Sequence, residues 1–164
     1  MTTLLDTTLL DAVARHSPFD AEENGPVPTA ISGLMTVRAT RPSGIAHAIA
    51  RPLVCLVVQG AKNVTMGTRS FDFGAGDSLL ITADVPIVSQ ITRASRAVPY
   101  LSLVLELDPA VIAELAGEMK AAPVGEVAPV RVEPTDAEVA DAALRLMRLL
   151  DRPASLPVLQ AQLI

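Results

Sequence analysis

Between Arg51 and Asp108 the chain alternates short apolar segments with turn residues, and this pattern constrains the fold most strongly. Residues 53–58 (LVCLVV) are continuously apolar, which favours a strand covered on both faces. Residues 101–107 (LSLVLEL) place four leucines at alternating positions, so that they share one face of a strand. Gly67-Thr68 is typical of a tight hairpin, and residues 84–86 (DVP) of a turn. Short strands at this spacing predict a sandwich or a barrel.

Helices are predicted on both sides of this block. Residues 3–15 repeat apolar positions at helical spacing, and Pro18 ends the segment because proline disfavours helix in the residue before it. Asp108-Pro109 predicts the start of a second helix, with Asp108 as its N-cap. Residues 135–138 (TDAE) match a capping box and predict a last helix that ends near Asp151.

The composition limits the classes of partner. The 164 residues are enough for one domain with a substantial core. Half of the residues are hydrophobic, yet no apolar run approaches the roughly 18 residues that cross a bilayer. Apolar surface in excess of a core predicts a partner chain or a ligand cavity. The net charge of −5 argues against direct DNA binding by this chain, because DNA affinity rests on Lys and Arg that contact phosphates.

The cysteine content and the N-terminus predict the compartment. Cys55 is the single cysteine, which excludes an internal disulfide and fits a reducing cytoplasm. It lies within an apolar run, so a buried core thiol is favoured over a reactive one. The first ten residues contain Asp6 and no basic residue, so they lack the charged start of a signal peptide. We therefore expect a cytoplasmic protein that does not contact the membrane.

No catalytic residue, metal site or cofactor is predicted. His16 and His47 are the only histidines, and neither stands at a recognisable spacing from acidic residues that could complete a zinc or iron site. Ser78 and Ser102 lack the context of a nucleophilic serine, and no phosphate-binding or dinucleotide-binding glycine pattern occurs. These absences predict that the protein is not an enzyme.

Polar residues among the strands are the candidates for ligand binding. Side chains of this kind at the mouth of a barrel can hydrogen-bond a small molecule. The alternative is that they simply face water. The predicted ligand-binding residues are Gln59, Asn63, Thr82, Gln90 and Tyr100.

Three motifs resemble the N-terminal domain of AraC-type transcriptional regulators. An apolar strand ends in Gln59-Gly60-Ala61-Lys62, a turn reads Gly76-Asp77-Ser78-Leu79-Leu80, and a later strand begins Pro99-Tyr100-Leu101-Ser102-Leu103. Residues 149–153 (LLDRP) also fit the family, so that the resemblance covers residues 5–164. The strands sit between an N-terminal arm and a strongly apolar helix, as this family leads one to expect.

The resemblance implies a mainly β fold: a cupin-like jelly-roll barrel with an N-terminal helix and C-terminal α-helices. On this basis residues 1–30 form the N-terminal helix and arm, 31–107 the barrel, and 108–164 a helical dimerisation segment. The implied function is that of a bacterial regulator's sensing domain, which binds a small-molecule effector and forms a homodimer. DNA would be contacted only through a C-terminal helix-turn-helix domain that this sequence lacks. In metal-binding cupins histidines line the barrel; here His47 falls at one of the matching positions, but Ile49 and Ile87 occupy others, so no metal is carried over.

The helix from Asp136 to Asp151 is the predicted dimer interface, because its apolar positions exceed what one packing face needs. The predicted interface residues are Val139, Ala143, Leu146, Met147 and Leu150. Two alternatives remain open. One is a small metal-dependent cupin enzyme, such as an isomerase or dioxygenase, and the other is a dimerisation domain without a ligand.

Overall fold

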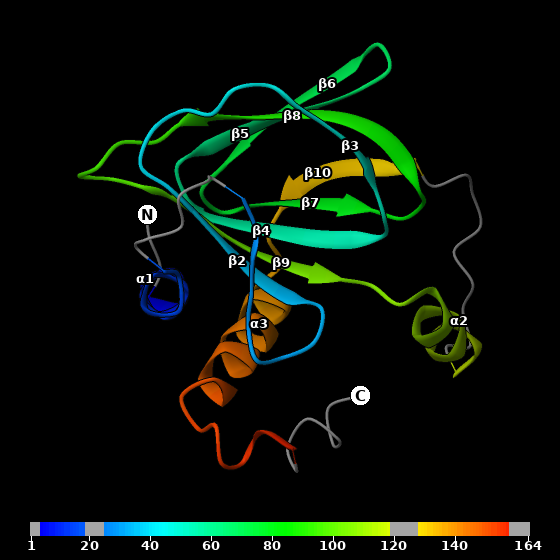
Figure 1. Cartoon of the computed structure of the whole chain (residues 1–164). Helices are drawn as coiled ribbons and strands as arrows, with labels where there is room; N and C mark the ends of the chain where they lie inside the picture. Colours follow the sequence, from blue (N-terminus) through cyan, green and yellow to red (C-terminus); the bar gives the residue numbers. More distant parts are fainter. Residues whose placement is uncertain (1–3, 19–24, 119–127, 158–164) are drawn as a thin grey trace.

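Two antiparallel β-sheets pack face to face, and helices cover the outer face of the larger one (Figure 1). This arrangement comes from a computed structural model, which describes residues 4–18, 25–118 and 128–157. The described residues contain no helix that is long and apolar enough to cross a membrane. The fold is therefore mainly β with appended helices, as predicted, and its architecture is that of a cupin-like barrel.

The larger sheet has six strands in the order β1-β2-β9-β4-β7-β10. Their bounds are Val27–Pro28 (β1), Leu34–Ala39 (β2), Tyr100–Glu106 (β9), Leu53–Gln59 (β4), Asp77–Ile81 (β7) and Val130–Pro134 (β10). The smaller sheet has four strands in the order β3-β8-β5-β6. Their bounds are Ala46–Ala50 (β3), Val85–Arg93 (β8), Ala61–Met66 (β5) and Arg69–Gly74 (β6).

The central strand β4 shows why the apolar run of the sequence is continuous. Cys55 and Val57 are buried in the core between the two sheets, while Leu56 is buried in a second core between the larger sheet and the helices. Strand β9, its neighbour, divides its side chains in the same way, with Val104 in the first core and Leu103 in the second. Each strand is thus covered on both faces, which the alternation rule requires.

Helices α1 (Leu4–Arg15) and α3 (Ala137–Leu149) pack against each other on the outer face of the larger sheet (Figure 1). The last turn of α1 leaves backbone carbonyls without helical partners, and nearby side chains satisfy them. Arg38 on β2 donates to the carbonyl of Ala14 at 3.0 Å, and the Ser17 hydroxyl donates to that of Val13 at 2.6 Å. The bond from Arg38 connects the end of α1 to the sheet.

The predicted hairpin and the predicted start of the helix at Asp108 are confirmed in detail. Gly67-Thr68 joins β5 to β6, with Met66 opposite Arg69. Asp108 caps α2 (Pro109–Glu118), because its side chain accepts from the amide of Ala110 at 2.8 Å. The N-cap of α3 is Asp136, one residue later than the capping box predicts. The Asp136 side chain accepts from the amide of Glu138 at 2.8 Å, while the Thr135 hydroxyl is paired with Ser78 Oγ at 2.6 Å.

One boundary differs from the prediction. Pro86 lies inside β8 and not in a turn; it is tolerated there because β5 pairs only with the part of β8 that begins at Val88, so this end of β8 has a neighbour on one side. The segment 108–164 contributes the strand β10, which pairs with β7, as well as helices.

Candidate functional site

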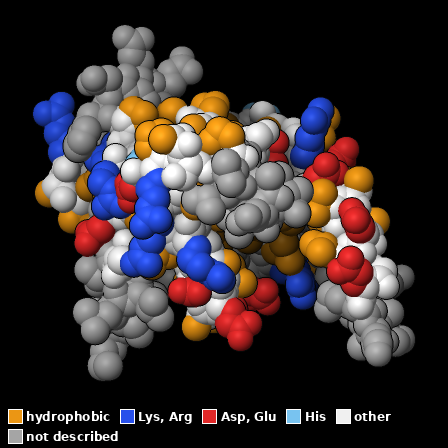
Figure 2. Space-filling view, turned by 90° about the horizontal axis from the view of Figure 1, so that it is seen from below, with side chains coloured by type: hydrophobic (Ala, Val, Ile, Leu, Met, Phe, Trp, Pro, Cys, Tyr) orange, Lys and Arg blue, Asp and Glu red, His pale blue; other side chains and the backbone are white. Residues whose placement is uncertain are grey.

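A largely apolar groove of about 810 Å³ lies between α2, α3 and the end of β9; we call it the α2 groove. Its apolar lining includes Leu105 and Leu107 at the end of β9, Ile112 and Leu115 on α2, and Leu149 on α3. Figure 2 views the molecule from the side of the helices and shows apolar side chains in the hollow beside α2. The volume falls within the range of about 300–1,000 Å³ that is usual for small-molecule sites.

Backbone hydrogen bonds hold the walls of the α2 groove in place. The amide of Glu106 donates to the carbonyl of Gly33 at 2.8 Å, and the amide of Leu107 donates to that of Pro52 at 2.9 Å. Gly33 has a φ of 80°, a conformation that favours glycine. The three chain segments that meet here are therefore fixed to one another at the point where the sheet ends and α2 begins.

The charges at the α2 groove are mostly negative. Asp84, Glu106 and Asp108 contribute three carboxylates, and Arg51 contributes the one guanidinium among the described lining residues. All four residues are exposed to solvent. Such a rim disfavours an anionic ligand and tolerates a neutral or cationic one, because like charges repel.

A second group of polar atoms lies inside the barrel. Tyr100 and Ser102 on β9 are completely buried, and neither Tyr100 Oη nor Ser102 Oγ has a hydrogen-bond partner of good geometry, although they lie close to each other and to Cys55. Burial raises the pKa of the Cys55 thiol, and the nearby Lys62 ammonium offsets part of this rise. Burial also raises the pKa of Tyr100 well above its ordinary value. These groups are therefore neutral at physiological pH.

The predicted ligand-binding residues do not come together. Tyr100 points into the barrel, whereas Gln59 donates to the carbonyl of Pro99 at 2.8 Å and Thr82 is exposed. Asn63 and Gln90 are direct cross-strand partners, so their side chains share one face of the smaller sheet.

That shared face is the outer one. Val64, next to Asn63 on β5, is buried between the sheets, so Asn63 points the opposite way. Asn63 donates to Ser70 Oγ at 2.9 Å and to Asp72 Oδ1 at 2.8 Å. A role of the five predicted residues in one common ligand site is therefore not supported by their placement.

The predicted dimer residues lie on two sides of α3. Ala143 and Met147 are buried against α1 and the sheet, so they belong to the core of this chain and are not free to contact a partner. Leu146 lines the α2 groove, Leu150 is half-buried and Val139 is exposed. The excess of apolar positions on α3 is thus accounted for largely within the chain. An interface at Val139, Leu146 and Leu150 stays a prediction.

Sequence reasoning missed the α2 groove. Its lining comes from segments far apart in the chain, from Ile31 to Leu149, and no local motif marks such a meeting point. The available signal was the apolar face of residues 109–118, where Ile112 and Leu115 are 42% and 55% exposed. Within the described part of the chain no three His, Cys, Asp or Glu residues gather in a way that could hold a metal ion.

The sandwich with its flanking helices defines the class of protein as a cupin-like domain, and comparison with known proteins gives the family. The family of the AraC-type transcriptional regulator N-terminus matches residues 30–164. The chain belongs to this family, which confirms the resemblance seen in its motifs. This family comprises the N-terminal regions of transcriptional regulators.

Solved structures share the fold at low sequence identity. An apo variant of ToxT from Vibrio cholerae strain SCE256 aligns with a TM-score of 0.53 and 6% identity, over 74% of this chain and 49% of ToxT. A structure of ToxT with a bound unsaturated fatty acid aligns with a TM-score of 0.46 and 7% identity, over 67% and 42% of the two chains. An RmlC-like cupin from Methanocaldococcus jannaschii aligns with a TM-score of 0.42 and 10% identity, over 58% and 93%. This chain therefore spans about half the length of ToxT. No curated protein matches it.

Proposed function

We propose that this domain senses a small apolar molecule, neutral or cationic, which binds in the α2 groove and regulates transcription. Membership of the AraC-type family supports a ligand-sensing regulatory role. The observation that carries the choice of site is the α2 groove itself: about 810 Å³, largely apolar, and bounded by segments that backbone hydrogen bonds hold together.

The apolar lining supplies the affinity in this proposal. Covering the exposed surfaces of Ile112 and Leu115 with a ligand contributes roughly 25 cal/mol per Å² of apolar area removed from water, before the cost of association. The polar rim supplies selectivity. Three carboxylates against one guanidinium make a carboxylate or phosphate on the ligand unfavourable.

Three amphiphiles that share a ten-carbon chain test this proposal: 1-decanol, decylammonium and decanoate. Each is added below its critical micelle concentration, and its affinity is measured from the rise in the unfolding midpoint by calorimetry. We expect 1-decanol and decylammonium to stabilise the domain and decanoate to bind at least tenfold more weakly. The proposal fails if none of the three stabilises the domain, or if decanoate binds best.

A matched pair of variants locates the site. Ile112→Asp places a charge on the groove wall, and Val139→Asp places one on an equally exposed residue outside the described lining, at 42% and 43% exposure. We expect Ile112→Asp to weaken 1-decanol binding at least tenfold, because the ligand would bury an unpaired carboxylate. Val139→Asp should leave it unchanged. Equal effects of both variants would exclude the α2 groove as the binding site.

We further propose that DNA contact is made by a C-terminal domain outside this one and that the regulator acts as a homodimer. The net charge of −5 gives this chain a poor electrostatic match to phosphates. Among the predicted interface residues on α3, Val139 is the one that is exposed by more than a third. Val139→Lys should weaken dimerisation if this helix forms the interface and leave it unchanged if another surface of the chain does, and sedimentation velocity of the chain separates the two outcomes.

A further inference from the structure

Of the four strands that end the two sheets, β3 alone lacks the features that keep sheet edges from pairing with another chain. In the larger sheet, β1 has two residues and contains Pro28, while β10 carries Arg131, Glu133 and Pro134. In the smaller sheet, β6 carries Arg69 and Asp72. Short length, charge and proline are the usual protections of an edge. From Gly44 to Ala50 the chain has no Lys, Arg, Asp, Glu or Pro.

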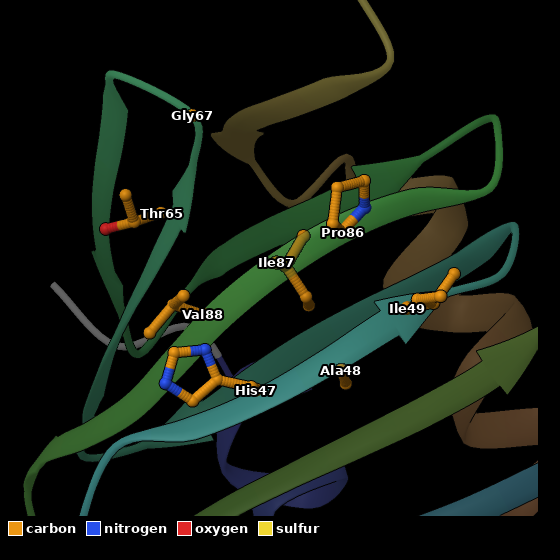
Figure 3. A pocket seen from close by; sticks show the side chains of 8 residues that line it. All are labelled: His47, Ala48, Ile49, Thr65, Gly67, Pro86, Ile87 and Val88. Carbon is orange, nitrogen blue, oxygen red and sulfur yellow. The ribbon is translucent and has the colours of Figure 1, made fainter.

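The side chains of β3, and that of Ile45 just before it, are also unusually open. Ile45 is 64% exposed and Ile49 76% exposed, the two largest values among the exposed large hydrophobic residues that the structure describes. No described strand pairs with β3 on the side away from β8. A hollow of about 620 Å³ adjoins the strand. Figure 3 shows its lining, with His47 and Ile49 of β3 beside Pro86 and Val88 of β8.

We propose that β3 is an interface between two copies of this chain, which pair antiparallel around a two-fold axis at His47. The sequence from Ile45 to Ile49 reads IAHAI, the same in both directions. A two-fold interface requires that each residue i meets residue j of the partner and that j meets i. A palindromic strand meets this condition with identical pairs on both sides of the axis. The two four-stranded sheets would then form one continuous sheet.

The side chains are complementary in this register. Ile45 of each copy lies opposite Ile49 of the other, which gives two identical pairs. The small residues Ala46 and Ala48 form two pairs across the axis in the same manner. The Ile45 pairs extend the apolar surface that Ile49 forms with Pro86 and Val88 along β3 and β8. Cross-strand apolar pairs of this kind contribute roughly 0.2–1 kcal/mol each.

The charges are compatible with this pairing. Arg51, which follows β3, falls opposite Ser43 of the other strand, so no Lys, Arg, Asp or Glu meets a like charge across the axis. The net charge of −5 on each copy opposes association in general, but the paired segment contains no carboxylate.

The size of the contact sets the expected affinity. Seven paired residues extend about 24 Å at roughly 3.4 Å per residue. A contact confined to one strand edge of this length is expected to bury less than the roughly 800 Å² per partner that a standard stable interface buries. We therefore expect a dimer that dissociates in the micromolar range, and the proposal does not depend on the function assigned to the α2 groove.

Sedimentation velocity of the whole chain from about 1 to 500 µM, together with circular dichroism to verify folding, tests the interface. His47→Lys places two ammonium groups next to each other at the axis and should raise the dissociation constant at least tenfold. Val98→Lys introduces the same charge at a 54% exposed residue outside the edge and should leave it unchanged. A chain that is monomeric throughout this range, or a dimer that withstands His47→Lys, would overturn the proposal.

Thiol cross-linking tests the register. In a His47→Cys variant the two new thiols face each other and should form an intermolecular disulfide under mild oxidation, because directly opposed strand residues have suitable Cα distances of about 4.5–5.5 Å. In an Ile45→Cys variant each new thiol faces Ile49 and should not cross-link. Cys55 is buried and does not compete. Equal cross-linking of both variants would exclude this register.

Discussion

The guanidinium of Arg15 donates two hydrogen bonds to the carboxylate of Asp151, at 2.8 and 3.2 Å, across 136 residues of sequence. His16 Nε2 lies 2.8 Å from the same carboxylate. The end of α1 is thereby joined to the residue that follows the last turn of α3. Because Asp151 holds both partners, its protonation state decides whether the link exists.

We expect the contribution of Asp151 to stability to depend on pH. The hydrogen bonds from Arg15 and His16 lower the pKa of Asp151 in the folded chain. Its stabilising contribution is therefore present above the unfolded-state pKa of about 3.9 and is lost as pH falls through the lower folded-state value. Asp151→Asn should reduce the free energy of unfolding at pH 7 by no more than about 1 kcal/mol, because the pair is exposed. Denaturant titrations of both proteins between pH 2 and pH 7 measure the difference, which should vanish at the acid end.

Asp141→Asn is the control for this measurement. Asp141 forms an exposed pair with Arg145 at 3.3 Å, one turn away on the same helix, and does not connect two elements. Its replacement should change stability less than that of Asp151. A loss for Asp151→Asn that stays constant down to pH 2 would exclude the pKa-linked mechanism.

Met147 is a core residue in the structure, and its truncation should show this directly. The side chain is completely buried in the core shared by α1, α3 and the larger sheet. Met147→Ala should cost about 2–5 kcal/mol of unfolding free energy, the usual range for a large-to-small core replacement. Val139→Ala, at an exposed position of the same helix, should cost less than about 0.5 kcal/mol. Similar losses for both variants in urea titrations would contradict the placement of α3.

A comparison of Gly60 with Gly67 separates two effects of replacing a glycine: an unfavourable backbone conformation and a steric clash of the new Cβ. Both have positive φ, at 83° and 59°, so an alanine at either position adopts an unfavourable backbone conformation that costs about 1 kcal/mol. At Gly60 the new Cβ would also stand 2.5 Å from the carbonyl oxygen of Arg93 and 3.0 Å from Tyr100 Cα, whereas at Gly67 nothing lies within 4 Å. We expect Gly60→Ala to lower the unfolding midpoint clearly more than Gly67→Ala. Equal shifts would mean that the backbone around Gly60 moves without cost.

The thiol of Cys55 should be unreactive in the folded protein. It is buried, and burial raises its pKa, so the reactive thiolate is scarce near neutral pH. Modification by Ellman's reagent should be slow in buffer and complete within seconds in concentrated denaturant. Rapid modification of the native chain, with no loss of structure by circular dichroism, would show that the barrel opens near β4.

Local patterns predicted the strands well because each signal lies within a few residues. Strand β4 follows from the apolar run at 53–58, and the β5–β6 hairpin follows from the pair Gly67-Thr68, because each signal depends only on adjacent residues. Pro86 was misassigned because its tolerance depends on how far β5 extends along β8, which no residue near Pro86 encodes.

The candidate site was less predictable for the same reason. Polarity alone marked Asn63 and Tyr100 as ligand residues, but strand alternation sends one to the outer face and the other into the barrel. The α2 groove depends on where Leu105, Ile112 and Leu149 meet after the sheet has formed. The palindrome from Ile45 to Ile49 was visible in the sequence, and it gained meaning once β3 proved to be an open edge.

Helix α3 forms part of two surfaces, the wall of the α2 groove and the core beneath α1. Leu146 and Leu149 form part of the wall of the α2 groove, while Met147, between them in sequence, is packed in the core beneath α1. A rigid helix cannot shift one of these surfaces without shifting the other. A ligand that shifts the groove wall therefore also shifts the contact with α1, and a partner that favours one position of α1 changes the affinity of that ligand by the same coupling free energy.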